Sequence, residues 1–429
     1  MKKEYRIILY TSIFLLCVVA SIILVVKKSN SVYEEESKPK VVKHKSMLSM
    51  NLEQTAGSGD YKTVTQSSWP TEGYKFNAEL SKCENGSTLS WDDTKKAVIV
   101  SGNLSDKCYV YFDIYQPTLA EYIKSQYTGT QGENNIYYHD SSLTNGAGDN
   151  SYRYAGANPN NFVCFGTTES PCPTDNLYRI IGVFGENYHG VTGKQLVKLI
   201  KYDYMTKDEL GTDGDYSQTY KEFGMDSTYK GTYGDGERIG VYYWNYKATG
   251  SATNTWSTSL LNKTNLNTNF INNIGTTWAN KIATVTWKVG GNTWANIGTK
   301  TSSVAYTNEI TNPVTTNTTD NATTYSAKIG LMYVSDYGFA ASPDAWTLTM
   351  SSYNNTTATN NNWMYMGLYE WTISRNADPS DNAFLVSGDG SVDYDYVDGI
   401  LGVRASFNLE SSVSYVSGSG SMSDPIVIN

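Results

Sequence analysis

An acidic, tyrosine-rich segment near the C-terminus is the strongest candidate for a functional site in this chain. Four aspartates lie there within ten positions of one another, and two tyrosines are interleaved with them. Carboxylates are potential metal ligands, and tyrosine offers amphipathic contact area with little mobile charge. With the polar residues just upstream, the segment is predicted to bind a ligand through ten residues: Asn376, Asp378, Asp381, Asn382, Asp389, Asp393, Tyr394, Asp395, Tyr396 and Asp398.

The spacing of these aspartates does not favour a metal site. A calcium loop of the EF-hand type places oxygen ligands at alternate positions and a glycine at the sixth position, and the cluster lacks this pattern. Asp213-Gly-Asp215-Tyr-Ser217 matches the first half of such a loop but has no glutamate at position twelve. We therefore expect solvated loop charges and no cofactor, with calcium as the open alternative.

Catalytic constellations are scarce in the rest of the chain. His44, His139 and His189 are far apart, and no GxSxG motif accompanies any of them. Many acids are present, but nothing singles out a pair suited to glycoside hydrolysis. The sequence therefore favours a binding protein over an enzyme, and a degenerate or unrecognised enzyme is an alternative.

Two arginines near the acidic segment are expected to have structural roles. Arg404 follows three apolar or small residues in a probable central strand, where an arginine must be paired. A buried ion pair or a carbonyl clamp is predicted for it, with Glu370 or an aspartate of the acidic segment as partner. Arg375 is expected to support the same segment, and direct ligand contact by Arg404 is the competing hypothesis.

The cysteines indicate an oxidising compartment. Cys17 lies in an apolar stretch, and the remaining four, Cys83, Cys108, Cys164 and Cys172, form an even set that allows three pairings. Local spacing favours Cys83–Cys108, which brackets a probable hairpin, and Cys164–Cys172, which closes a short loop. The absence of any CxxC makes a zinc site the weaker interpretation. Disulfides place the body of the chain outside the cell.

The apolar stretch at residues 7–26 is predicted to be an uncleaved transmembrane helix. It carries no charge, and basic residues precede and follow it. The excess of Lys and Arg after the stretch would keep the large domain in the cytoplasm, but long domains translocate largely regardless of charge. We therefore expect a single-pass protein of the cell membrane, anchored through residues 7–26, with its C-terminal body extracellular.

Composition narrows the choice of partner. The net charge is −9, and 35 tyrosines stand against 11 phenylalanines. An acidic chain without a basic patch is unsuited to nucleic acid. An adhesin or receptor-like role is predicted, with an unknown ligand that could be a glycan, a protein or a cell-wall polymer. The structural alternative is a pilin-like surface subunit, although the glycine and glutamate that type IV pilins need around the apolar stretch are absent.

The chain is predicted to contain five parts. These are an anchor at 1–28, a flexible stalk at 29–71, a small β module at 72–113, a linker at 114–150 and a main domain at 151–429. In the main domain, residues 177–185 and 195–205 are predicted to pair as a hairpin. Two short helices are predicted from apolar residues near one face: Leu261, Leu266, Phe270 and Ile274 for the first, and Trp278, Ile282 and Val285 for the second.

Strands are also expected at residues 326–335 and 363–374 and in the C-terminal segments, which gives an α+β domain with helices on one face of its sheet. Four aromatic residues recur at odd spacings in the second of these strands and are expected to pack on a sheet face: Trp363, Tyr365, Tyr369 and Trp371.

The order of several short motifs carries a family resemblance. RIIGVF is followed by WSTSLL, IGLMYVSDYGF, EWTISR, FLVSGDGSV and GVRASF. From about Tyr152 to its end, the chain resembles bacterial surface proteins with a C-type-lectin-like fold of the formylglycine-generating-enzyme type. In these domains the last motif usually reads GVRP, and here Ala405 replaces the proline.

The resemblance implies a C-type-lectin-like mixed sheet with short helices, preceded by a small disulfide-stapled β unit. It also implies a binding role more than a catalytic one. Enzymes of the formylglycine-generating type use a cysteine pair in the C-terminal part of the domain, and no cysteine follows Cys172. The Glu-Pro-Asn and Trp-Asn-Asp motifs through which C-type lectins bind calcium and sugar are also absent.

Overall fold

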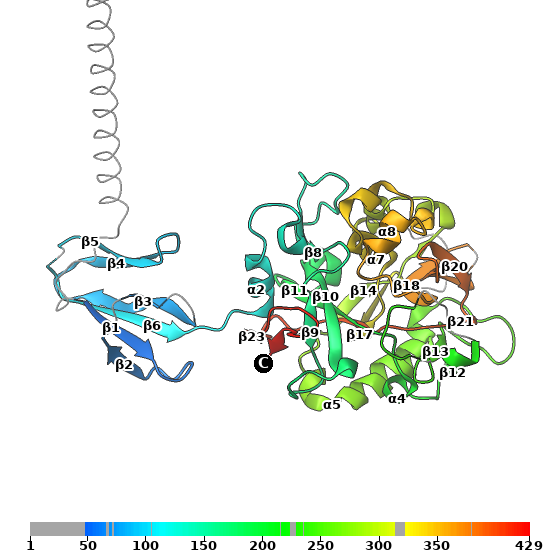
Figure 1. The fold of residues 1–429 in the computed structure, drawn as a ribbon, viewed down its shortest axis with the longest axis horizontal. Helices are drawn as coiled ribbons and strands as arrows, with labels where there is room; N and C mark the ends of the chain where they lie inside the picture. Colours follow the sequence, from blue (N-terminus) through cyan, green and yellow to red (C-terminus); the bar gives the residue numbers. More distant parts are fainter. Residues whose placement is uncertain are drawn as a thin grey trace, which may run out of the picture. The chain divides into compact units, whose positions relative to one another are not determined.

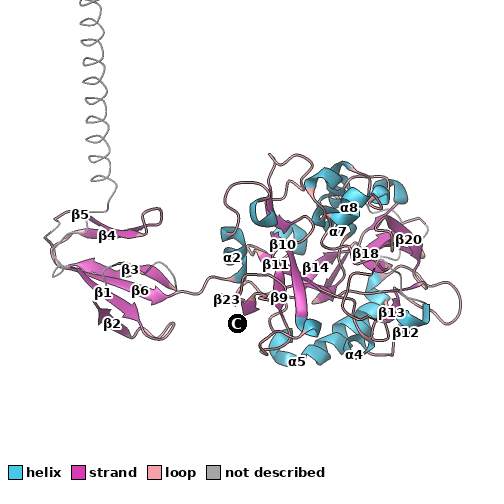
Figure 2. Cartoon of the chain, viewed as in Figure 1, coloured by secondary structure: helices cyan, strands magenta, loops and turns pink. Residues whose placement is uncertain are grey.

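The chain has a mixed α+β structure, with many short strands and few helices among the described residues, and divides into two compact units (Figures 1 and 2). The first unit is Met1–Gln116 and the second is Pro117–Asn429. The computed structural model describes residues 48–65, 68–70, 73–103, 105–214, 216–223, 229–234, 236–313, 322–378 and 380–429.

The transmembrane part of the predicted fold is corrected by the structure. The predicted anchor, residues 7–26, lies outside the described residues, and no described helix is long and apolar enough to cross a bilayer. The longest helical stretch among the described residues, Leu261–Phe270 followed by Ile271–Ala279, is rich in Asn and Thr and is interrupted at Gly275. A bilayer span needs about 20 predominantly apolar residues. The prediction of a single-pass membrane protein is therefore wrong for the described part of the chain.

The first unit is built on a four-stranded sheet in the order β2-β1-β6-β3. β1 (Leu48–Glu53) pairs in parallel with β6 (Cys108–Ile114) and antiparallel with β2 (Tyr61–Val64), and β3 (Tyr74–Cys83) pairs with the other side of β6. A separate hairpin is formed by β4 (Thr88–Asp92) and β5 (Ala97–Ser101). Residues 29–71, predicted to be a flexible stalk, thus contain two strands. The apolar residues of β1 pack into the core of the first unit, and the predicted module at 72–113 does not include them.

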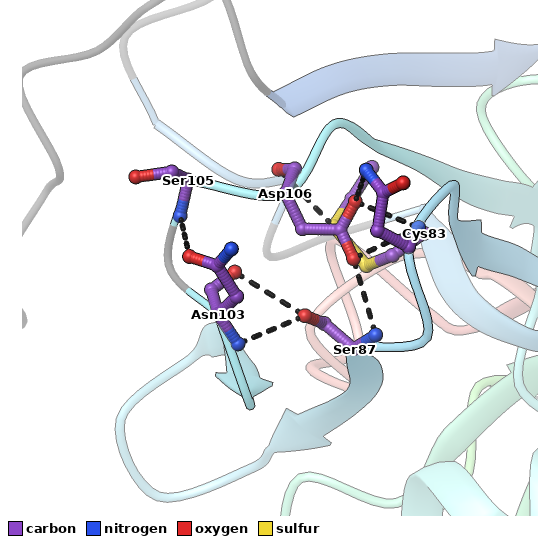
Figure 3. Close-up of a disulfide and its surroundings, with 7 residues drawn as sticks. Cys83, Ser87, Asn103, Ser105 and Asp106 are labelled. Carbon is purple, nitrogen blue, oxygen red and sulfur yellow. Dashed lines mark hydrogen bonds between the residues drawn. A yellow bond between two sulfur atoms is a disulfide. The ribbon is translucent and has the colours of Figure 1, made fainter.

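A disulfide joins Cys83 and Cys108, which are direct partners in the register of β3 and β6. Figure 3 shows the turn beside it, where Asp106 accepts hydrogen bonds from the backbone of Asn85 and Ser87. Burial opposes the ionisation of Asp106, but these hydrogen bonds outweigh it and hold its pKa below the usual value. The pairing of Cys83 with Cys108, and of Cys164 with Cys172 in the second unit, is confirmed.

The second unit is organised around a sheet in the order β17-β22-β11-β10-β8-β7. Its central strands are β10 (Leu177–Phe184) and β11 (Leu196–Lys201), in which every residue is buried. They pair antiparallel, as predicted, and helix α3 (Glu186–His189) lies in their connection. The sheet is completed by β7 (Ile136–His139), β8 (Ser151–Tyr154), β9 (Phe162–Cys164), β17 (Ile329–Gly330) and β22 (Ser406–Asn408).

From Pro117 onward, the predicted linker at 114–150 belongs to the second unit. It contains α2 (Leu119–Ser125), a capping box between Thr118 and Glu121, and the edge strand β7. Leu119 and Ile123 are buried in the main core, so apolar contacts offset the entropy cost of ordering this segment. The predicted boundary at residue 151 is therefore too late in the chain.

The prediction of two helices after residue 256 holds only for the first. Helical structure covers Leu261–Phe270 and α5 (Ile271–Ala279), but Ile282 bridges to Leu409 and β14 (Val285–Lys288) pairs with β16 (Thr324–Ala327). Ile282 and Val285, whose spacing suits a helix, are therefore buried in extended segments that pair with other strands. Further helices are α4 (Lys207–Leu210), α6 (Ser302–Tyr306), α7 (Val334–Ala340) and α8 (Thr356–Asn360).

Two smaller sheets carry the C-terminal segments. The first has the order β15-β18-β19-β20, from Gly291–Asn292, Glu370–Asn376, Asn382–Val386 and Val392–Tyr396. The second has the order β12-β13-β21, from Tyr216–Thr219, Gly240–Tyr243 and Ile400–Leu401. The chain ends in the hairpin of β23 (Tyr415–Ser417) and β24 (Val427–Ile428).

The aromatic residues predicted to share a sheet face do not lie in one strand. Strand β18 begins at Glu370, so Trp371 is in the strand and the other three precede it. Trp363, Tyr365 and Trp371 are buried, whereas Tyr369 is 46% exposed. The alternation expected of a single strand therefore fails before residue 370.

Replacing both Cys83 and Cys108 by Ser should destabilise the first unit by about 3 kcal/mol, because the bridge closes a loop of moderate length around a small core. Hydrogen exchange should then accelerate in β3 and β6. The matched control is Cys164→Ser with Cys172→Ser, which should leave exchange in β3 and β6 unchanged. Equal protection of these strands with and without the Cys83–Cys108 bridge would contradict the prediction.

Candidate functional site

Strand β20 presents four of the ten predicted ligand-binding residues to solvent. It pairs with β19 in the register Phe384↔Tyr394 and is the last strand of its sheet (Figure 1). Its four residues after Val392 are all exposed, and Tyr396 has 58% of its surface accessible. We call the exposed edge formed by Asp393, Tyr394, Asp395, Tyr396 and Asp398 the acidic–tyrosine face. Because β20 is a regular strand, the side chains of Asp393 and Asp395 point to one side of it and those of Tyr394 and Tyr396 to the other. Because β18 and β19 are fully buried, this face stands on a rigid support.

The aspartates of this face also occupy backbone donors of the strand. Asp393 Oδ1 accepts from the N–H of Tyr394 at 2.9 Å, and Asp395 Oδ1 accepts from the N–H of Tyr396 at 2.8 Å. Free N–H groups on an edge strand invite another strand to pair, and carboxylates on the strand oppose this. The face is therefore arranged to bind through its side chains.

Further tyrosines extend the face from an element that the sequence did not connect with it. Tyr243 of β13 is the register partner of Ile400 in β21, and the N–H of Asn245 donates to Val397 O at 3.0 Å. Tyr246, 44% exposed, stacks on Tyr243 with ring centroids 4.7 Å apart. Nothing in the sequence around Tyr243 and Tyr246 signalled this proximity, because their segment lies some 150 residues earlier in the chain.

The other predicted ligand residues are divided between surface and interior. Asp378 and Asp389 are exposed. Asp389 Oδ1 accepts hydrogen bonds from the N–H and the hydroxyl of Ser391, and these bonds stabilise the turn. Asn376 and Asn382, by contrast, are 0% and 4% exposed. The structure therefore places these two asparagines away from solvent and corrects their predicted role in ligand contact.

The turn between β18 and β19 is held by a buried asparagine that sequence analysis missed. Asn254 Nδ2 donates to the backbone oxygens of Asn376 and Asn382, and the Asn254 N–H donates to Ser380 O at 2.9 Å. Asp381, half-buried in the same turn, accepts from the N–H of Val397 at 2.8 Å through its carbonyl oxygen. These contacts connect the turn to the segment that follows the acidic–tyrosine face.

Arg404 has both features expected of it. Its Nε donates to Glu370 Oε1 at 2.8 Å and its Nη2 donates to Met364 O at 2.6 Å, and both charged side chains are buried. Burial opposes the charge on the guanidinium, but the Glu370 carboxylate outweighs it and raises the pKa of Arg404. The pair fixes the start of β18 to the segment that precedes β22.

Arg375 supports the opposite end of β18. Its Nε donates to Val289 O at 2.9 Å, and it faces Gly291 of β15 in the register. A Cβ at Gly291 would approach Arg375 Nη1 to 2.7 Å, so the absence of a side chain there makes room for the guanidinium. Burial lowers the pKa of Arg375 to about 10.

The histidines available for catalysis are structural. His189 Nδ1 accepts from the N–H of Val191 at 3.1 Å, and His139 Nδ1 accepts from the N–H of Ala147 at 3.0 Å. The ring of His139 is fully buried against Phe339 and Trp346. Burial, with Arg153 adding to it, keeps the pKa of His139 well below its usual range.

The described residues contain no group of three or more His, Cys, Asp or Glu side chains that could hold a metal ion. His44 of the sequence analysis lies outside the described residues.

Comparison of the chain with protein-family models, curated proteins and solved structures gave no match.

Arg404→Met should lower the free energy of unfolding by about 3–5 kcal/mol, because it leaves Glu370 buried without its partner. Urea denaturation followed by tryptophan fluorescence measures the change. The double variant Arg404→Met with Glu370→Leu should recover most of the loss, since no charge then remains buried. A double variant as unstable as the single one would contradict the role of the pair.

His139 should make stability depend on pH. Its folded-state pKa is depressed, so below pH ~6.5 the unfolded chain takes up a proton that the folded chain does not. The contribution of uncharged His139 to the free energy of unfolding is fully present above that pH. It is lost as the pH falls, by about 1.4 kcal/mol per pH unit. His139→Asn keeps an acceptor for the Ala147 N–H, and urea denaturation between pH 5 and 7 should give it the shallower slope. Equal slopes would refute the assignment.

Proposed function

We propose that the protein is a non-catalytic binding protein, and that the acidic–tyrosine face is its recognition surface. The observation that carries this proposal is the exposure of acidic and aromatic side chains on β20 above two fully buried strands. Proteins commonly place binding residues on exposed segments that a rigid scaffold positions. An adhesin or receptor-like role is the form of this function that the surface supports best.

The chemistry of the face favours a cationic ligand. Three aspartates and two tyrosines lie along this exposed edge, and the segment of Tyr243 and Tyr246 pairs with the residues that follow it. Carboxylates attract ammonium and guanidinium groups, and the electron-rich faces of tyrosine rings add cation–π attraction. A basic polypeptide segment offers both kinds of contact at close spacing. A glycan or another polymer is the alternative ligand class, bound through the tyrosines alone.

Two further arguments favour binding over catalysis. The two described histidines are buried and hydrogen-bonded to the backbone through Nδ1. The proposed resemblance to C-type-lectin-like domains of the formylglycine-generating type also implies binding, because the cysteines of the catalytic members are not matched here. The two disulfides require that the protein fold in an oxidising compartment.

Asp395→Asn with Asp398→Asn should weaken binding of a basic peptide about tenfold, because two exposed charge contacts are together worth ~1.4 kcal/mol. The purified full chain is screened against immobilised basic, acidic and neutral peptides and against glycans, and the affinity of a hit is measured by interferometry. Binding should also weaken as salt rises from ~50 to about 500 mM. The asparagine introduced at position 395 keeps an oxygen that can accept from the Tyr396 N–H, so the strand should stay intact.

The matched control is Asp208→Asn with Asp344→Asn, two exposed aspartates elsewhere on the second unit. It removes the same charge and should leave the affinity unchanged. Equal weakening in both variants would attribute the effect to net charge and contradict the assignment of the face. A well-folded chain that binds none of the probes would instead support a structural or assembly role.

A further inference from the structure

A lysine and an aspartate from distant parts of the chain meet in the dry centre of the second unit. Lys198 lies in the middle of β11, and Asp336 lies in the first turn of α7. Lys198 Nζ is 2.7 Å from Asp336 Oδ2, and both side chains have no solvent-accessible surface. The N–H of Tyr333 donates to the same Oδ2 at 3.0 Å, which fixes the carboxyl group against the amine.

Aromatic rings surround the amine. Nζ lies 4.5 Å from the ring centroid of Tyr333 and 4.9 Å from those of Trp287 and Tyr188. The Tyr188 hydroxyl contacts all the polar atoms of the pair: it accepts from Lys198 Nζ at 2.6 Å and donates to the Asp336 oxygens at 2.7 and 2.8 Å. The amine and the carboxyl group are therefore joined by a bridging hydroxyl in a site without water access.

Nucleophilic attack needs the amine of Lys198 in its uncharged form. Burial lowers the pKa of Lys198, although Asp336 opposes the shift. Passing one proton from the ammonium to the carboxylate turns an ion pair into a neutral amine and a carboxylic acid without any exchange with solvent. In a medium of low polarity the neutral pair avoids the desolvation cost of two charges. A neutral amine next to a carboxylic acid is a nucleophile beside an electrophile.

We propose that Lys198 and Asp336 form an intramolecular isopeptide bond that covalently joins β11 to the first turn of α7. Nζ attacks Cγ of Asp336, a C–N bond forms and one C–O bond breaks. The departing oxygen leaves as water, taking both protons it needs from the amine and the carboxyl group. The reaction is a condensation with no change of oxidation state, so no oxidant, reductant or cofactor is required.

Neighbouring groups suit this step. The Tyr188 hydroxyl relays the proton between nitrogen and oxygen, because it is hydrogen-bonded to both. Arg153 Nη1, 3.8 Å from Asp336 Oδ1, stabilises the negative charge that develops on the carboxyl oxygen. Glu309 is a positioning residue: it accepts from the N–H groups of Val334 and Ser335 at 3.1 and 2.9 Å and so holds the first turn of α7.

The second buried lysine of β11 provides a contrast within the same strand. Lys201 Nζ is 3.0 Å from Glu209 Oε1, but Glu209 is 15% exposed, and Lys201 Nζ also donates to Asp175 O. No tyrosine hydroxyl is recorded between this amine and its carboxylate in the described residues. Lys201 is therefore expected to remain a free amine. The inference is independent of the proposed binding role.

Peptide mapping of the full-length protein tests the bond directly. Trypsin should cleave after Lys194 and Lys201 but not after Lys198, because an acylated lysine is not a substrate. A branched peptide should join residues 195–201 to residues 329–375, with a mass lower by one water than the sum of its two parts. Cleavage after Lys201 shows that the segment is accessible to the protease. Recovery of the two peptides as separate species, with Lys198 cleaved, would overturn the proposal.

Variants then assign the roles. Lys198→Met keeps the apolar stem in the aromatic surroundings and should abolish the branched peptide, and Asp336→Ala should do the same. Tyr188→Phe keeps the ring and removes the bridging hydroxyl, so the fraction of joined peptide should fall. The result from the unaltered protein decides the proposal even if a variant fails to fold.

Discussion

Burial of charged side chains is the constraint on which the rest of the second unit depends. The central strands β10 and β11 are covered on both faces, yet they carry cations that cannot leave the core. Removing an ion from water costs several kcal/mol, so each must find a partner with good geometry. The structure supplies Asp336 for Lys198, Glu209 for Lys201 and an amide with carbonyl oxygens for Arg179.

The partner of Lys198 lies 138 residues away in the chain, and such contacts join local strands into one unit. Arg153 of β8 pairs with Asp149 and also approaches Asp336 of α7. Arg404 and Glu370 join the segment before β22 to the start of β18. Satisfying one buried charge thus determines where a second element lies, and apolar packing fills the space between them. The polar contacts select the arrangement, while most of the stabilisation comes from apolar burial.

The acidic–tyrosine face follows from the same arrangement. Arg404 and Arg375 hold the two ends of β18, Asn254 holds the turn to β19, and β20 is the next strand along the hairpin. Because β18 and β19 are buried, β20 is the strand of this sheet that faces solvent. Its aspartates occupy backbone donors of the strand, which leaves side chains as the means of recognition.

Local information was enough for several features. The cysteine spacing predicted both disulfides, the apolar runs predicted β10 and β11, and the lone arginine in an apolar segment predicted the buried pair of Arg404. Strongly patterned segments are well determined because burial and propensity agree there. The segment from Ile282 to Val285 was mispredicted because its apolar spacing suits a helix, whereas its backbone pairs with distant strands.

Composition and spacing indicated the α+β class, favoured the two disulfide pairings that the structure contains, and located the acidic, tyrosine-rich segment. Tertiary structure alone decided that Asn376 and Asn382 are interior, that Tyr243 and Tyr246 lie beside the face, and that Lys198 meets Asp336. The physical reason is that composition and periodicity describe residues close in the chain. Burial and partnership arise from contacts between segments more than a hundred residues apart, and no local pattern records them.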